Sequence, residues 1–174
     1  FLTCAFAFWV VLPLIYPDKR EGNNKLLKLT SCLFILVVLQ IVYGAFVAGL
    51  NAGRVCNTWP KMCGEWIPES ISTLTPFWEN FVKGHYEIQF IHRTLALIIV
   101  SFVLLIWVKG REIQQNNLQK KSLNLLLSVV IFQTVIGIFT LILVVPISLA
   151  LIHQIGAFLL LMSVVFSLFT FSKS

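Results

Sequence analysis

Long apolar runs with few charged residues dominate this sequence and restrict what it can fold into. Four of them exceed 20 residues, at about 29–50, 87–108, 122–145 and 147–171, and a shorter run covers 1–16. The hydrocarbon core of a bilayer, about 30 Å thick, requires roughly 20 apolar residues per helix. Charged residues make up 11% of the chain, whereas soluble domains carry about 25%. The sequence therefore predicts an all-α membrane protein.

The run at 1–16 opens the chain without an initiator methionine, a basic leader or a small-residue cleavage site, so it does not resemble a signal peptide. We interpret it as the end of a preceding transmembrane helix, closed by Pro17 and followed by a cytoplasmic loop at 17–28. Residues 29–174 are then expected to form a transmembrane four-helix bundle with an outer loop at 51–86. On this interpretation the chain is the C-terminal part of a longer protein.

Lysine and arginine collect in two short segments, which predicts the orientation of the bundle. The segments 17–28 and 109–121 carry four basic residues each, and Lys173 falls on the same side. The segment 51–86 carries three basic and three acidic residues. Positive loops stay on the cytoplasmic side, so we expect 51–86 on the outer side of the membrane. The net charge of +6 therefore reflects membrane orientation and not a nucleic-acid partner.

Two phrases occur twice along the chain. Gln40–Phe46 reads Q-x-V-x-G-x-F, and Gln133–Phe139 repeats the pattern. The apolar run after each phrase carries an Ile-His pair, with the histidines at His92 and His153. This arrangement predicts two repeated two-helix units, each contributing one histidine.

Both histidines fall a few residues inside spans that enter the membrane from the outer side, so they should lie at similar depth. An ionisable residue within a span is costly and indicates function by default, although packing against a neighbouring helix is the alternative for each. A structural zinc site requires four protein ligands. Haem supplies four equatorial nitrogens itself, so the pair favours His92 and His153 as axial ligands of one haem iron.

The residues around the histidines suggest supporting roles but leave alternatives open. Arg93 either neutralises a haem propionate or extends its charge to the headgroups. Gln89 and Gln154 are candidates to hydrogen-bond near the ligands. Gly44 and Gly137 either leave room for a flat macrocycle or allow ordinary close helix packing. The sequence contains no nucleophilic triad, phosphate-binding glycine loop or intramembrane carboxylate pair.

Two of the four cysteines, Cys56 and Cys63, lie in the expected outer loop. An oxidising outer compartment would allow a disulfide between them, and two free thiols are the alternative. The other two, Cys4 and Cys32, lie within apolar runs and are expected to act as small hydrophobic side chains.

Several phrases together resemble the haem A synthase family, in its order and spacing and over nearly the whole chain. They are Gly44–Gly53, Asn57–Met62, Trp66–Pro68, Gln89–Arg93, Gly137 and His153-Gln154. The match is to the C-terminal half of that family. The family is an eight-helix protein of two similar four-helix bundles, in the bacterial plasma membrane or mitochondrial inner membrane. It oxidises the ring-D methyl group of haem O to a formyl group, giving haem A for terminal oxidases.

This resemblance implies that His92 and His153 bind a haem b, and that the outer-loop cysteine pair found in some members corresponds to Cys56 and Cys63. In the family, the N-terminal bundle holds the substrate haem and a glutamate three residues before its own His-Arg. Gln89 occupies that place here, which favours an electron-transfer or structural role over catalysis by this half. The expected partners are the lipid bilayer and the N-terminal half, and haem O synthase, an electron donor and a second copy of the chain are further candidates.

Two other classes of protein share part of this pattern. One is a non-catalytic membrane cytochrome b-type electron-transfer subunit, which also carries paired histidines on helices but does not need the Asn57–Met62 phrase. The other is a haem-free assembly or scaffold protein in which both histidines only pack. Haem content separates the scaffold from the other two, and turnover of haem O separates the enzyme from the cytochrome.

Overall fold

The computed structural model describes residues 1–17, 22–69, 71 and 73–173. Helices make up its regular structure, and within these residues no strand is present apart from an isolated bridge between Met62 and Glu65. The α-helices are α1 (Leu2–Ile15), α2 (Asn24–Gly49), α3 (His85–Arg111), α4 (Asn117–Ile142) and α5 (Ile147–Phe171), with short 3₁₀ helices η1 (Ala52–Arg54) and η2 (Phe77–Phe81). The predicted all-α class is therefore confirmed.

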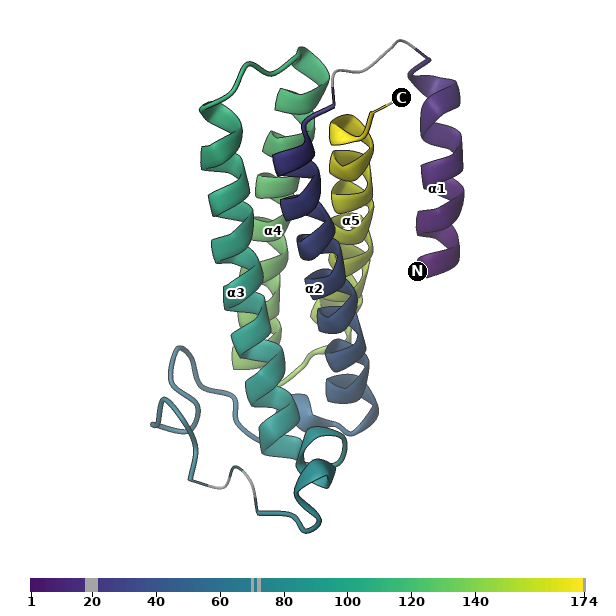
Figure 1. Ribbon diagram of the computed structural model, residues 1–174. Helices are drawn as coiled ribbons and strands as arrows, with labels where there is room; N and C mark the ends of the chain where they lie inside the picture. Colours follow the sequence, from purple (N-terminus) through teal and green to yellow (C-terminus); the bar gives the residue numbers. More distant parts are fainter. Residues whose placement is uncertain (18–21, 70, 72, 174) are drawn as a thin grey trace.

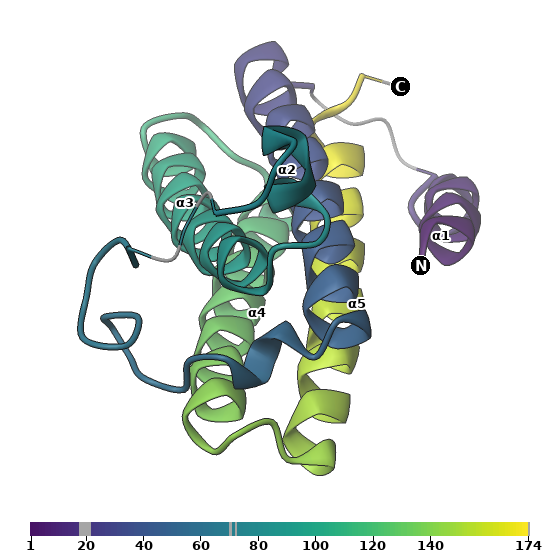
Figure 2. The same cartoon turned by 90° about the horizontal axis from the view of Figure 1, so that it is seen from below.

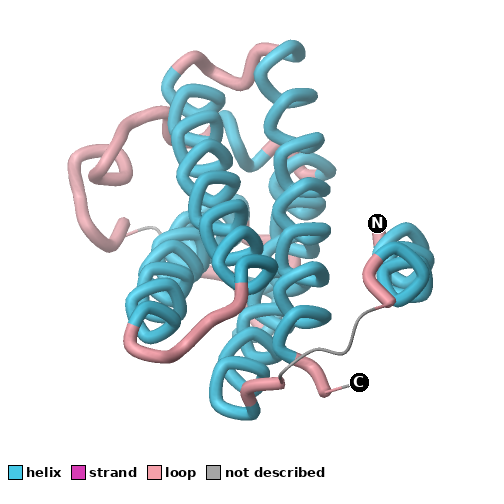
Figure 3. Tube along the Cα trace, turned by 90° about the horizontal axis from the view of Figure 1, so that it is seen from above, coloured by secondary structure: helices cyan, strands magenta, loops and turns pink. Residues whose placement is uncertain are grey.

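Helices α2 to α5 form an up-and-down bundle (Figure 1). Consecutive helices pack side by side and α5 closes the ring against α2, so that α3 and α5 lie diagonally opposite. Helix α1 packs on the outside of α5, where Phe1 stacks near Phe158 and Trp9 near Phe169. The view along the bundle in Figure 3 shows α1 standing beside the other four helices. The four bundle helices are each long and apolar enough to cross a membrane, as the sequence predicted.

The helices extend further into the basic segments than the sequence predicted. Helix α2 begins at Asn24, rather than at 29, because the Asn23 side chain caps it by accepting from the Leu26 backbone N–H at 2.9 Å. Lys25 and Lys28, expected in the loop at 17–28, are consequently helical. Lys19 and Arg20, assigned to the same loop, lie outside the described residues.

The connection between α3 and α4 is similarly shorter than expected. It spans 112–116, because α3 continues to Arg111 and α4 begins at Asn117. Asn116 and Gln119 form a reciprocal capping box at the start of α4. Lysine and arginine are good helix formers. A charged stretch next to a span can therefore remain helical while the charged ends of its side chains reach water.

The apolar core fills the half of the bundle away from the long outer loop. Its fully buried side chains come from the start of α2, the end of α3, the start of α4 and the end of α5, and include Leu33, Val37, Ile99, Val103, Ile106, Leu126, Val130, Leu161 and Val164. The other half differs: no residue of α5 from 147 to 155 is buried, whereas most from 160 to 171 are. Apolar packing is therefore concentrated in one half of the bundle, whereas buried polar side chains such as Gln89 and Gln133 occur in the other half.

The loop between α2 and α3, named the outer loop after its predicted side of the membrane, covers 50–84 and is slightly shorter than the expected 51–86. Asn51 adopts a left-handed backbone conformation (φ 54°) directly after α2, as asparagine tolerates. A tight turn follows at Met62–Glu65, where Cys63 and Gly64 both have positive φ and the two end residues exchange backbone hydrogen bonds. Figure 2 shows the loop lying across and beside one end of the bundle.

Candidate functional site: a paired-histidine centre

His92 and His153 approach each other inside the outer half of the bundle. His92 lies seven residues past the start of α3 at His85, and His153 six residues past the start of α5 at Ile147. Both helices begin at the outer-loop end (Figure 1). The ring centroids are 6.5 Å apart and the ring planes are inclined at 83°. Because α3 and α5 are diagonal, the pair meets across the interior of the bundle.

A glutamine from the preceding helix contacts each histidine. Gln40 Nε2 donates to the main-chain carbonyl of His92 at 3.0 Å, and Gln133 Nε2 donates to that of His153 at 2.9 Å. The Gln40 amide nitrogen also lies 3.5 Å from His92 Nε2. Sequence reasoning did not include either glutamine among the site residues. The sequence could have indicated both glutamines, because each is the first residue of the repeated Q-x-V-x-G-x-F phrase.

A glycine four residues after each glutamine faces the histidine ring. A Cβ atom added to Gly44 would lie 3.2 Å from His92 Cε1, and one added to Gly137 would lie 2.8 Å from His153 Cε1. A side chain at Gly137 would force the His153 ring to shift, and one at Gly44 would fit only if the His92 ring moved by a few tenths of an ångström. The two glycines therefore make room for the imidazoles of the neighbouring helices, a role distinct from the two considered from the sequence.

Buried polar atoms without a hydrogen-bond partner concentrate around the histidines. Among the described residues they are Nδ1 of His92 and His153, Oε1 of Gln40, Gln89 and Gln133, Nη1 of Arg93, and Nε2 of Gln115 at the other end of the bundle. Such atoms are rare in proteins, since leaving one unpaired costs free energy. Six of them in one region indicate that this interior suits a polar or coordinating ligand.

Arg93 follows the first histidine and binds the outer loop. Its Nη2 donates to the carbonyls of Thr58 at 3.0 Å and Pro60 at 2.9 Å. The guanidinium carbon lies 5.2 Å from the centre of the Trp59 ring, within range of a cation–π interaction. Arg93 thus links α3 to the Asn-Thr-Trp-Pro-Lys phrase, and neither sequence alternative for it described this contact.

Two other amides hold the same loop against the bundle. Asn57 Nδ2 donates to the carbonyls of Gly53 at 2.9 Å and of Leu141, in the last turn of α4, at 2.8 Å. Gln89 Nε2 donates to the Cys56 carbonyl at 3.0 Å and is almost fully buried. The structure therefore places Gln89 against the outer loop and does not show a hydrogen bond from it to either histidine.

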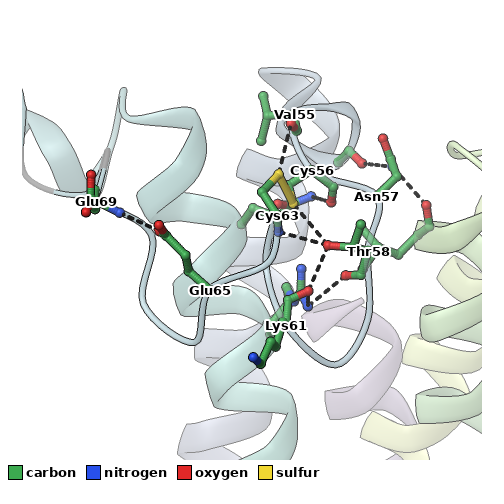
Figure 4. Close-up of a disulfide and its surroundings, with 12 residues drawn as sticks. Val55, Cys56, Asn57, Thr58, Lys61, Cys63, Glu65 and Glu69 are labelled. Carbon is green, nitrogen blue, oxygen red and sulfur yellow. Dashed lines mark hydrogen bonds between the residues drawn. A yellow bond between two sulfur atoms is a disulfide. The ribbon is translucent and has the colours of Figure 1, made fainter.

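Cys56 and Cys63 form a disulfide within this loop (Figure 4). Cys56 is buried, whereas Cys63 is exposed. Thr58 ties the two arms together, because its hydroxyl donates to the Lys61 carbonyl at 2.8 Å and accepts from the Cys63 backbone N–H at 2.8 Å. The disulfide and these bonds make the segment 56–63 a compact cover beside the histidine end of the bundle.

Gln154 does not join the paired-histidine centre. It is exposed on α5, beside Leu151, Ile155 and Phe158 and near Phe1 of the chain start. Successive residues on a helix point about 100° apart, so Gln154 projects from a different side of α5 than His153 does.

The paired histidines fit a haem better than an isolated metal ion. In the part of the chain that the structure describes, no group of three or more His, Cys, Asp or Glu side chains could hold a metal. A metal at this centre must therefore bring its other ligands, as haem iron does. Two histidine–metal bonds of about 2.0–2.1 Å, with half a ring on each side, span about 6 Å between ring centroids. The observed 6.5 Å agrees with that span.

The fold and the site together define a class of protein: a membrane-type helical bundle of two repeated helix pairs, each contributing one interior histidine. A family model described as cytochrome oxidase assembly protein matches residues 1–165, and the chain belongs to this family.

Curated relatives of the chain carry the name haem A synthase, which confirms the resemblance drawn from the motifs. That of Flavobacterium psychrophilum is 39% identical over 99% of this chain and 52% of its own length. That of Flavobacterium johnsoniae is 40% identical over 99% of this chain and 52% of its own length. That of Wolbachia pipientis wMel is 41% identical over 74% of this chain and 35% of its own length. The chain spans about half the length of the first two relatives. No solved structure matches it.

Proposed function

We propose that this chain is the haem b-binding half of a haem A synthase, with His92 and His153 as the two axial ligands. The observation that carries the proposal is the imidazole pair, 6.5 Å apart across the bundle interior and surrounded by buried polar atoms without partners. Membership of the cytochrome oxidase assembly family supports it.

His92 and His153 would hold the haem between them, and a haem held by two histidines would be suited to electron transfer and not to oxygen binding. It would supply a one-electron redox couple, whose potential depends on ligand identity, hydrogen bonding and burial. We therefore assign this half to electron relay or structural support. The oxidation of the ring-D methyl of haem O to a formyl group would take place in the other half of the full-length enzyme. Gln89 is consistent with this division. Its side chain has no carboxyl group, and its amide donates a hydrogen bond to the Cys56 carbonyl.

Arg93 is proposed to pair with a haem propionate in addition to holding the loop. Its Nη2 is occupied by the loop carbonyls, but its Nη1 is buried and has no partner among the described residues. A charge-assisted hydrogen bond from Nη1 to a carboxylate would satisfy that atom.

The test of the haem site is a reduced-minus-oxidised absorption spectrum of the purified chain in detergent, supplied with haem. We expect a low-spin b-type spectrum from the unchanged chain and its loss in His92→Ala and in His153→Ala. His85→Ala is the matched control, because His85 is exposed at the start of α3 and should leave the spectrum unchanged. A well-folded chain with a featureless spectrum would overturn the proposal.

The enzymatic part requires the full-length protein. Conversion of haem O to haem A by that protein, abolished by His92→Ala with the fold intact, would support the synthase assignment. A full-length protein that binds haem and accepts electrons without converting haem O would instead be a membrane cytochrome b-type electron-transfer subunit.

A further inference from the structure

The two helix pairs share a contact pattern that the proposed function does not use. Gln40 in α2 and Gln133 in α4 each donate an amide hydrogen to the main-chain carbonyl of a histidine on the next helix. We propose that both glutamines are positioning residues that set the orientation of His92 and His153 as haem ligands, an inference that rests on the proposed function.

The spacing of the pattern explains how each unit could act. Residues four apart lie one above the other on the same face of a helix. Gln40 and Gly44 therefore present a donor and an adjacent empty space to α3, and Gln133 and Gly137 present the same pair to α5. The donor holds the histidine backbone, and the space one turn away receives its ring.

A bond to the main-chain carbonyl is suited to positioning. The carbonyl oxygen has two lone pairs, so it can accept from a side chain as well as from its own helix. A bond at this point restrains the height and rotation of the histidine helix relative to its neighbour, and both determine where the imidazole points.

In the pair formed by α4 and α5, a glycine on α5 also makes room for the glutamine side chain. Gly156 lies three residues after His153 on α5, and a Cβ atom added there would collide with Gln133 Oε1. The Gln133 side chain is buried, and that oxygen has no hydrogen-bond partner among the described residues. The Gln133 amide is thus enclosed against the α5 backbone, where the absence of a side chain at Gly156 makes room for its oxygen.

The decisive comparison uses leucine substitutions of three glutamines in the chain loaded with haem. Gln40→Leu and Gln133→Leu each remove one donor to a histidine carbonyl. Gln119→Leu is the matched control, because the buried Gln119 donates to the Thr170 carbonyl of α5 at 3.1 Å, at the opposite end of the bundle. Gln→Met at positions 40 and 133 provides a second donor-free pair, close to glutamine in length, if a leucine variant does not fold.

The readouts are the electron paramagnetic resonance spectrum of the oxidised haem and the rate of haem dissociation. The spectrum reports the angle between the two imidazole planes, which is 83° in this structure. We expect Gln40→Leu and Gln133→Leu to shift the spectrum and to raise the dissociation rate about tenfold each, the factor corresponding to about 1.4 kcal/mol. Gln119→Leu should lower thermal stability and leave both readouts unchanged.

Two failures can be told apart. If both glutamine variants match Gln119→Leu in spectrum and dissociation rate while His92→Ala and His153→Ala still lose haem, the positioning role is wrong and the proposed function stands. If the unchanged chain binds no haem, the proposed function itself fails.

Discussion

A methyl group is the smallest addition that probes the paired-histidine centre, because Gly44 and Gly137 each face an imidazole of the neighbouring helix. The two positions are not equally tight: the shortest distance from an added Cβ to the ring is 2.8 Å at Gly137 and 3.2 Å at Gly44. Overpacking a site that cannot relax typically costs about 1–3 kcal/mol. The difference in distance therefore predicts an order of severity for the two alanine substitutions.

We expect Gly137→Ala to lower the thermal unfolding midpoint and the haem occupancy more than Gly44→Ala, since the His153 ring must move further. Unfolding in detergent, followed by circular dichroism with haem absorbance in parallel, measures both effects. Gly49→Ala is the control, because nothing lies within 4 Å of a Cβ at that position and alanine is favoured over glycine in a helix by up to about 1 kcal/mol. Equal effects at positions 44 and 49 would contradict the assigned role of Gly44.

At the scale of an element, the connection between α4 and α5 has an unusual backbone. Val144 and Val145 both adopt left-handed conformations, with φ of 62° and 59°. This region costs about 1–2 kcal/mol for an ordinary residue and is least favourable for β-branched side chains. The turn is supported by the Val145 backbone N–H, which donates to the Thr140 carbonyl at 2.8 Å, and by Pro146 directly before α5. This turn lies at the same end of the bundle as His153, which is six residues past the start of α5.

Val144→Gly should therefore stabilise the protein by about 1 kcal/mol, because glycine adopts positive φ without strain and the exposed Val144 side chain contributes little burial. The measurement is the thermal unfolding midpoint in detergent. Val145→Gly should gain less, since the Val145 side chain packs beside Gly53. A lowered midpoint for Val144→Gly would show that the turn is not strained.

At the scale of the whole molecule, the charge distribution separates the two ends of the bundle. At the helix ends opposite the outer loop (Figure 1) lie the basic residues Lys25, Lys28, Lys109, Arg111, Lys120 and Lys121, and Lys173 follows the end of α5. The outer loop is held to the bundle by Arg93, Asn57 and Gln89. The proposed orientation, with this loop outside, follows from the positive-inside tendency.

Trypsin added to right-side-out membrane vesicles should accordingly cleave after the exposed Lys61 and Lys83 in the outer loop. The basic ends of α3 and α4 should be cleaved only in inverted vesicles. Fragment sizes on a denaturing gel provide the measurement, and cleavage of the outer loop in inverted vesicles alone would reverse the orientation.

Cleavage after Lys61 also tests the disulfide. Because Lys61 lies between Cys56 and Cys63, the two fragments should separate only after reduction. An Arg54→Gln, Lys83→Gln background removes the other tryptic sites of the described loop residues, and Cys63→Ser should make the separation independent of reductant.

The sequence alone was sufficient for the four long apolar helices, their up-and-down order and the approach of His92 to His153. Apolar length, charge placement and repeated phrases are properties of consecutive residues, so they can be read without knowing the packing. The span ends were less accurate, with α2 and α4 each beginning five residues earlier than expected. Capping by Asn23 and Asn116, and not the change from apolar to charged residues, determines those ends.

Only the tertiary structure decided which neighbours each side chain meets. It directs Arg93 and Gln89 to the outer loop, leaves Gln154 exposed, and brings Gln40 and Gln133 to the histidine carbonyls. These outcomes depend on the rotation of each helix about its axis and on the diagonal arrangement of α3 and α5. Both are settled when four helices pack together and the outer loop folds back on them, and no single stretch of sequence contains that information.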